Sequence, residues 1–326
     1  NMRAQAERFG TEIVTDDVTA VQLDGPVKVV TDGEGGTHRA HAVILAMGSA
    51  YRELGLPDEK RLSGHGVSWC ATCDGFFFRD QDIVVVGGGL TGIEAAAEFA
   101  EARRAVTLVA GAVLGPSLSV PGRRSVAKKL HKLGATIIEG STVHAVGATD
   151  VTLSDGRTLP AAATVWTAGF GVPALAAASG LRTDALGRLL TDETLTSIDD
   201  DRIVAAGDAA APSGVPLRMS CQAALPLGAQ AANTVLARIA GTEPAPISQA
   251  FTGQCISLGR AAGTIQLART DDAPIPLYLG GRAAALVKEQ VCKGTLAFLR
   301  KEARKPGAYF WLKSAKRAKA LDVETA

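Results

Sequence analysis

The feature that most constrains this chain is an apolar run that leads into three consecutive glycines. Ile83–Val86 predicts a buried strand, Gly87–Gly89 a turn, and Thr91–Arg103 a helix. Val106–Val109 then predicts a return strand. Strand, turn, helix and strand in this order indicate a parallel β-α-β unit. Two neighbouring parallel strands need a crossover connection, and the predicted helix provides it.

Similar elements are predicted on both sides of this unit, which indicates an α/β chain. They are the strands Glu12–Val14, Val27–Val30 and Val43–Ala46, the helix Ser125–Leu133, the strand Ala135–Ile138, the hairpin of Val151–Leu153 with Thr158-Leu159, and the strand and turn Val165–Gly169.

The glycine turn itself has the spacing of a dinucleotide-binding site. Gly87, Gly89 and Gly92 form G-x-G-x-x-G, with Gly88 inside the motif. Glycines at these positions allow a tight turn, a close approach of pyrophosphate to the backbone, and close packing of helix on strand. The amino terminus of the following helix adds N–H donors for the phosphates. The pattern predicts nucleotide binding, and a glycine turn without a ligand is the alternative.

The choice between NADH and NADPH is open in the sequence. The carboxylate that binds the adenosine ribose of NAD is expected at the end of the return strand, where this chain has Ala110 and Gly111. No arginine follows at once to bind the 2′-phosphate of NADP, although Arg123 and Arg124 lie further along.

A close pair of cysteines lies ahead of the nucleotide strand. Cys70 and Cys73 are separated by two residues, and Asp74 follows them. Two thiols at this spacing can close a small disulfide ring, and a lowered pKa makes one of them a nucleophile in exchange. A neighbouring carboxyl group can move the proton that exchange requires. The pair therefore indicates redox chemistry, with two inert cysteines as the alternative.

Composition excludes several other classes. Five cysteines are too few and too scattered for a disulfide framework or a second metal-ligand pair, so no metal site is predicted. The lone cysteines, Cys221, Cys255 and Cys292, are interpreted as small core residues. Aromatic content of 5% argues against a nucleic acid ligand. No apolar run reaches the roughly 18 to 20 residues of a membrane span, and no signal-peptide pattern opens the chain, so a cytoplasmic location is expected.

The end of the chain is a distinct basic region. Residues 281–326 hold 11 Lys/Arg against 4 Asp/Glu. An amphipathic segment, Val287–Leu299, is followed by Tyr309-Phe310-Trp311 among lysines. This pattern is typical of a helix that lies on an anionic membrane surface, and equally of a solvated helix packed on the body of the protein.

From its start to about residue 89 the chain resembles bacterial, especially actinobacterial, thioredoxin reductases. Ala42–Ser49 and Gly66–Phe77 carry this resemblance. It implies that Cys70 attacks a partner disulfide, that Cys73 contacts the flavin and that Asp74 is the acid/base. It also implies FAD contacts at Ala46, Met47 and Gly48.

From about residue 87 to its end the chain is similar to actinobacterial FAD-dependent oxidoreductases related to type II NADH dehydrogenases. Leu90–Ala96, Val165–Phe170, Ala206–Ala210 and Met219–Ala224 carry this likeness. It implies that Asp208, after Gly207, binds the flavin ribityl chain and that Glu94 lies near the nicotinamide. Ala168 and Gly169 are expected among the cofactor-binding residues.

Together the two resemblances imply the pyridine nucleotide-disulfide oxidoreductase fold, with two nested dinucleotide-binding (Rossmann-like) domains. The first FAD β-α-β unit is expected to be missing, because no G-x-G-x-x-G precedes residue 87. We expect an FAD-type domain at 1–62 and 171–285, an NAD(P)H-binding domain with the cysteine pair at 63–170, and a basic amphipathic tail at 286–326. The chain is interpreted as a hybrid of two families joined at the glycine turn.

The resemblances imply an FAD-dependent oxidoreductase that passes electrons from NAD(P)H through flavin to Cys70 and Cys73, then to a thioredoxin-like protein disulfide. One alternative keeps the cofactors but reduces a quinone-type acceptor, with the tail in peripheral contact with a membrane. A second alternative is a nicotinamide-binding module without flavin turnover. A homodimer is expected from the superfamily.

Overall fold

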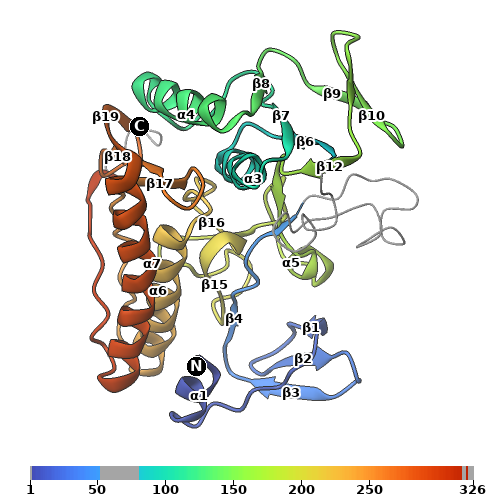
Figure 1. Ribbon diagram of the computed structural model, residues 1–326. Helices are drawn as coiled ribbons and strands as arrows, with labels where there is room; N and C mark the ends of the chain where they lie inside the picture. The colour runs from blue at the N-terminus through green and yellow to red at the C-terminus, as the bar shows by residue number, and fades with distance from the viewer. Residues whose placement is uncertain (1, 52–80, 318–320, 322–326) are drawn as a thin grey trace. The chain divides into compact units, whose positions relative to one another are not determined.

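The computed structural model describes residues 2–51, 81–317 and 321, and its chain divides into two compact units. Unit 1 comprises residues 1–50, 170–250 and 296–326, and unit 2 comprises residues 51–169 and 251–295. Each unit is therefore assembled from segments that lie far apart in the sequence (Figure 1).

Unit 2 is built on a parallel sheet of four strands in the order β12-β6-β7-β8. The strands are β6 (Asp82–Val86), β7 (Ala105–Val109), β8 (Thr136–Ile138) and β12 (Ala163–Trp166). Ile83–Val86 in β6 are all buried, because β6 has a neighbour on each side and a covered surface on both faces. A continuous apolar run, rather than an alternating one, is what such a strand requires.

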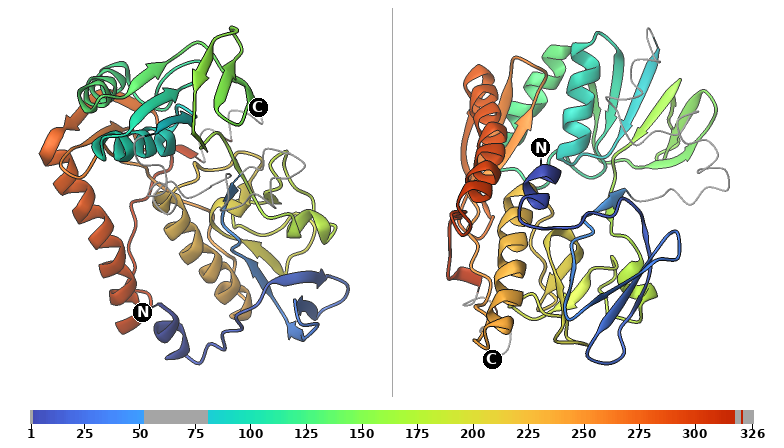
Figure 2. Two further views of the ribbon diagram at one scale, coloured as in Figure 1. Left: turned by 45° about the vertical axis from the view of Figure 1, so that its right-hand side comes forward. Right: turned by 90° about the horizontal axis from the view of Figure 1, so that it is seen from below.

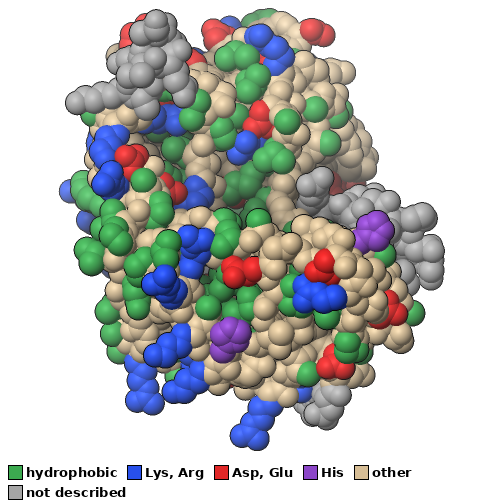
Figure 3. Space-filling view, turned by 90° about the horizontal axis from the view of Figure 1, so that it is seen from above, with side chains coloured by type: hydrophobic (Ala, Val, Ile, Leu, Met, Phe, Trp, Pro, Cys, Tyr) green, Lys and Arg blue, Asp and Glu red, His purple; other side chains and the backbone are tan. Residues whose placement is uncertain are grey.

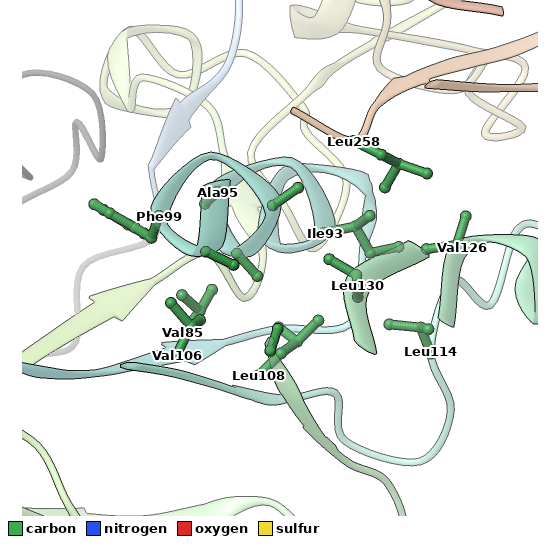
Figure 4. Packing of buried hydrophobic residues seen from close by; sticks show 14 of the residues in the cluster. Val85, Ile93, Ala95, Phe99, Val106, Leu108, Leu114, Val126, Leu130 and Leu258 are labelled. Atoms are coloured by element: carbon green, nitrogen blue, oxygen red, sulfur yellow. The ribbon is translucent and has the colours of Figure 1, made fainter. Parts of the chain in front are cut away.

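Helices α3 (Leu90–Glu101) and α4 (Val120–Leu133) contact the sheet and each other. Figure 4 shows their side chains meeting those of the strands, with Val85 and Leu108 opposite Ile93 and Leu130. On the other face, Val84, Val86 and Val109 pack with the antiparallel sheet of β9 (Val143–Val146), β10 (Asp150–Leu153) and β11 (Thr158–Pro160).

Helix α4 begins earlier than the apolar pattern predicts. The pattern predicts a start at Ser125, whereas the helix starts at Val120. The Ser119 side chain accepts a hydrogen bond from the N–H of Gly122, and Pro121 lies in the first turn. Both residues favour a helix start, and Gly134 in the left-handed conformation ends the helix.

A second sheet in unit 2 comes from the far end of the chain. It is antiparallel and consists of β17 (Gly253–Ser257), β18 (Gly263–Ala268) and β19 (Pro274–Gly280). Ile256 and Leu258 join the same buried cluster as α3 and α4. The fully buried Gln266 accepts hydrogen bonds from the N–H and hydroxyl of Ser119 and donates to the carbonyl of Ile275.

This packing divides the chain differently from the sequence-based domains. The sequence predicts an FAD-type segment running to residue 285, but residues 251–295 group with the nucleotide-turn unit. The physical reason is the shared apolar cluster, in which Ile256 and Leu258 bury their side chains against α3. Residues 296–317 likewise belong to unit 1 rather than to a separate tail.

Unit 1 contains short strands and one long helix. Its antiparallel sheet consists of β1 (Val18–Gln22), β2 (Lys28–Asp32) and β3 (Thr37–Ala40), drawn in blue in Figure 2. Two parallel pairs join β4 (Val43–Leu45) to β15 (Ile203–Ala205), and β14 (Leu189–Thr191) to β16 (Ala210–Pro212). The remaining elements are α1 (Met2–Glu7), β5 (Ala50–Tyr51), β13 (Phe170–Gly171), α5 (Leu175–Ala178) and α6 (Cys221–Ile239).

One strand predicted for unit 1 does not form, and one strand of unit 1 carries a buried lysine. The predicted strand Glu12–Val14 is wrong, because these residues lie in no strand and Val14 is 48% exposed, so neither pairing nor burial favours it. Lys28 is buried in β2 and forms an ion pair with Asp200 and a hydrogen bond to the carbonyl of Leu23. A buried ammonium needs such partners.

Helix α7 (Gly281–Arg304) covers the predicted amphipathic segment and begins six residues before it. Beyond it, the indole N–H of Trp311 donates to the carbonyl of Ser248, and Arg317 forms an ion pair with Glu193. Within the described part of the chain, no helix is both long and apolar enough to cross a membrane.

We expect that Leu130→Ala lowers the free energy of unfolding by about 2–5 kcal/mol, because it removes a fully buried side chain from the cluster between the helices and the sheet. Leu286→Ala, at a side chain that is 61% exposed, is the control and should change it by less than about 0.5 kcal/mol. Urea unfolding followed by circular dichroism measures both. Equal losses in the two variants would contradict the assignment of this core.

Candidate functional site

The glycine turn joins β6 to α3 at very short range. Gly87 has φ of +120°, and a Cβ there would lie 2.6 Å from Oγ1 of Thr167. A Cβ on Gly92 would lie 1.9 Å from the carbonyl oxygen of Gly87. Neither distance leaves room for a side chain, so both positions require glycine for the fold of the turn itself.

Gly88 is confined by the loop that follows β7. A Cβ on Gly88 would lie 2.4 Å from the carbonyl oxygen of Ala110. The carbonyl of Gly88 accepts a hydrogen bond from the N–H of Gly115 at 2.7 Å. The loop of residues 110–115 therefore rests directly on the turn.

Gly89 differs from its neighbours because it is open. It is exposed, and a Cβ there would meet no atom within 4 Å. It is also the N-cap of α3 and provides no side chain to the N–H groups of the first turn. An open space in front of uncapped helix N–H groups is what a phosphate group requires, so these residues fit a dinucleotide pyrophosphate.

Ala168 and Gly169 lie beside the turn, at the carboxyl end of β12. The backbone N–H of Ala168 would be 3.1 Å from a Cβ on Gly87, and Gly169 has φ of +96°. Thr167, which the sequence analysis did not select, donates from its hydroxyl to the carbonyl of Val86 at 2.7 Å. Ala168 thus lies next to Gly87, and the hydrogen bond of Thr167 connects the ends of β12 and β6.

Glu94 lies on α3, in its second turn, and its carboxylate has two partners. Oε1 accepts from the N–H of Ser257 at 2.8 Å and forms an ion pair with Nζ of Lys288. The carboxylate therefore links α3 to β17 and α7. Sequence reasoning connected Glu94 with the nicotinamide but could not connect it with Lys288, which is 194 residues away along the chain.

In unit 1, Gly207 and Asp208 form the short 3-10 turn η2 (Gly207–Ala209) directly after β15. Gly207 has φ of +69°, and a Cβ there would lie 3.6 Å from Cβ of Ala224, in the first turn of α6. The hydroxyl of Ser220 accepts from the N–H of Ala223 and caps that helix. Half-buried Asp208 thus lies within η2, which contacts α6.

Ala46, Met47 and Gly48 leave the sheet at the same edge. Strands β4 and β15 are parallel, and the N–H of Ala206 donates to the carbonyl of Leu45 at 2.9 Å. The residues that follow the two strands therefore emerge side by side, where ligands of α/β sheets bind. Met47 and Gly48 thus follow one strand and Gly207 and Asp208 the other, and their contact with a flavin stays a prediction.

The predicted catalytic residues Cys70, Cys73 and Asp74 lie outside the described residues. Cys221 and Cys292 are exposed, so their interpretation as small core residues is wrong; Cys255 is half-buried. Among the residues that the structure describes, no group of three or more His, Cys, Asp or Glu side chains is placed to hold a metal ion.

Comparison with known proteins gives a family match and several relatives. The model of the pyridine nucleotide-disulphide oxidoreductase family matches residues 4–231. The thioredoxin reductase of Streptomyces coelicolor is 62% identical over 109 residues, which are 33% of this chain and 34% of that protein. The chain thus spans about a third of the length of the curated relatives it matches. The predicted resemblance to actinobacterial thioredoxin reductases is confirmed; the one to type II NADH dehydrogenases stays a prediction.

Solved structures confirm the fold class. The thioredoxin reductase of Lactococcus lactis has a TM-score of 0.60 at 23% identity, over 72% of this chain and 78% of that one. The ferredoxin reductase of Rhodopseudomonas palustris has a TM-score of 0.64 at 21% identity, over 87% of this chain and 77% of that one.

We expect substitutions at two glycines of the turn to differ in their effect on stability. Gly92→Ala should lower the free energy of unfolding by about 1–3 kcal/mol or more, because its Cβ meets the Gly87 carbonyl. Gly89→Ala should change it by less than about 1 kcal/mol, because its Cβ meets nothing. Urea midpoints of the purified variants measure the difference. A Gly89→Ala variant as unstable as Gly92→Ala would show that Gly89, too, serves the fold.

Proposed function

The chain belongs to the pyridine nucleotide-disulphide oxidoreductase family, and on this basis we propose that it is an NAD(P)H-dependent flavoprotein oxidoreductase that reduces a protein disulfide. The observation that carries the proposal is the turn at Gly87–Gly92, in which Gly89 alone is open. The identity of 62% to a thioredoxin reductase over 109 residues supports a disulfide as acceptor.

In this proposal the turn binds the nucleotide through its backbone. Gly87 and Gly92 bring β6 and α3 close together, and Gly89 leaves space for the pyrophosphate before the helix N–H groups. Ala168 and Gly169, next to Gly87, form the neighbouring wall of the site. Nicotinamide and flavin, when bound, supply hydride-transfer chemistry.

Unit 1 holds the flavin through the segments that follow β4 and β15. Ala46–Gly48 and Gly207-Asp208 are assigned to its ribityl region, with the Asp208 carboxylate as hydrogen-bond acceptor. Within the described residues of unit 1, no strand leads through a G-x-G-x-x-G turn into a helix.

The cysteine pair carries the proposed disulfide chemistry, by its resemblance to thioredoxin reductases. The thiolate of Cys70 attacks the partner disulfide, so that a mixed disulfide forms and one partner thiol leaves with a proton from Asp74. The thiolate of Cys73 then attacks the sulfur of Cys70, which closes the internal disulfide and releases the second partner thiol. Two electrons pass to the partner, and NAD(P)H is the reductant that restores the dithiol.

A quinone-type acceptor at a membrane surface is the second candidate. The apolar side chains of Leu286, Val291 and Leu296 on α7 are more than half exposed. The same helix carries Lys293, Arg300 and Lys301. Figure 3 shows one face of the protein, on which hydrophobic side chains lie among basic and acidic ones. A mixture of this kind suits an anionic lipid surface.

Nucleotide binding is tested by Gly89→Val. The variant should fold, yet its affinity for NADH and NADPH should fall by about tenfold or more, because the side chain enters the space assigned to pyrophosphate. Gly294→Val, at another glycine with no atom near its Cβ, is the matched control. Fluorescence titration with each nucleotide measures the affinities, and unchanged affinity in Gly89→Val would contradict the assignment.

The acceptor is tested by Cys73→Ser. With added FAD and NADH or NADPH, the wild type should reduce thioredoxin disulfide and expose two further thiols, whereas Cys73→Ser should do neither, because the internal disulfide cannot close. Cys292→Ser, at an exposed lone cysteine, should retain full activity. Quinone reduction that persists in Cys73→Ser without any disulfide reduction would favour the second candidate. Failure to take up any flavin would leave only a nicotinamide-binding module.

A further inference from the structure

The loop after β7 lacks the group that a dinucleotide site normally has there. The position that carries a ribose-binding carboxylate in NAD sites is occupied by Ala110. Ala110 is buried in the cluster with α3 and α4. The next residue, Gly111, has no side chain that could bind the ribose.

A carboxylate follows the neighbouring strand β8, beside the position of Ala110. Val109 of β7 is in register with Ile138 of β8, and the N–H of Ala110 donates to the carbonyl of Ile138 at 2.8 Å. Glu139 follows Ile138 and therefore lies beside Ala110, about one strand spacing of 4.8 Å away. A carboxylate that follows β8 therefore lies next to the position at which β7 has none.

The side chain of Glu139 is aimed at the loop between β7 and α4. Its Oε1 accepts a hydrogen bond from the N–H of Leu114 at 2.5 Å. The next residue, Gly115, donates its N–H to the carbonyl of Gly88 in the glycine turn. Glu139 is therefore connected to the glycine turn by two hydrogen bonds that come from the adjacent residues Leu114 and Gly115. Oε2 has no partner among the described residues, and the side chain is exposed.

We propose that Glu139 binds the adenosine ribose hydroxyls and makes NADH the preferred nucleotide. A carboxylate oxygen accepts hydrogen bonds from the 2′- and 3′-hydroxyls of NADH. The same negative charge opposes the 2′-phosphate of NADPH. The inference rests on the proposed nucleotide site and names its selectivity.

Arg123 is the competing determinant, because an arginine there would favour NADPH. Its Cγ lies 3.6 Å from where a Cβ on Gly115 would be, so it borders the same loop. Its guanidinium forms no hydrogen bond or ion pair within the described part of the chain, whereas Glu139 is fixed by the Leu114 N–H. A fixed group loses less conformational entropy on binding, which favours Glu139 as the determinant.

Dissociation constants for NADH and NADPH, measured by fluorescence titration at constant ionic strength, test the inference. The wild type should bind NADH about tenfold or more tightly than NADPH. Glu139→Gln should lose about tenfold in NADH affinity and bind NADPH no more weakly than the wild type does. Glutamine still accepts from the Leu114 N–H, so the urea midpoint should stay unchanged. Arg123→Gln, the control, should leave the ratio of the two constants as it is.

The outcomes separate this inference from the proposed function. Wild-type preference for NADPH overturns the role of Glu139 without any variant being needed. An unchanged ratio in Glu139→Gln, with both nucleotides still bound, also overturns it but leaves the proposed function intact. A wild type that binds neither nucleotide contradicts the proposed function itself, and with it the selectivity assigned to Glu139.

Discussion

The close approach of α3 to β6 is the constraint on which the rest of unit 2 depends. The carbonyl oxygen of Gly87 occupies the place that a side chain at Gly92 would need. Because helix and strand touch at this point, the first turn of α3 lies directly over the carboxyl end of the parallel sheet. The same contact that packs the core therefore fixes the helix N–H groups where phosphate would bind. Fold and site share one set of glycines, with Gly89 as the member that the fold leaves free.

Parallel pairing explains why the remaining candidate residues gather as they do. Residues that follow neighbouring parallel strands emerge at one edge, as Ala168 does beside Gly87 in unit 2. In unit 1 the same rule applies to β4 and β15, which run in register and are followed by Ala46 and Ala206. Glu139 and Ala110 are a third case, because they follow paired residues of β8 and β7.

The β-α-β unit could be predicted from the sequence. An apolar run, three glycines, a helical segment and a second apolar run fit the order strand, turn, helix and strand. It did not predict the start of α4 at Val120, since the cap depends on Ser119 and on the buried Gln266, which comes from 147 residues further along the chain. The strand predicted at Glu12–Val14 does not form, because these residues pair with no strand in the described part of the chain. The glycines of the turn were selected from spacing alone, and their role in binding stays a prediction. Glu139 could not be selected, because no motif marks a residue that strand register brings to Ala110.

The carboxylate of Glu94 shows how residues outside the family match stabilise the site. The match ends at residue 231, yet Glu94 accepts a hydrogen bond from Ser257 and pairs with Lys288. On the same helix, Glu101 accepts from the N–H of Arg260 at 2.7 Å. These contacts fasten α3 along its length to the sheet of β17–β19. A phosphate site built on backbone N–H groups depends on the position of its helix, so the C-terminal sheet would support the proposed nucleotide site without supplying a ligand.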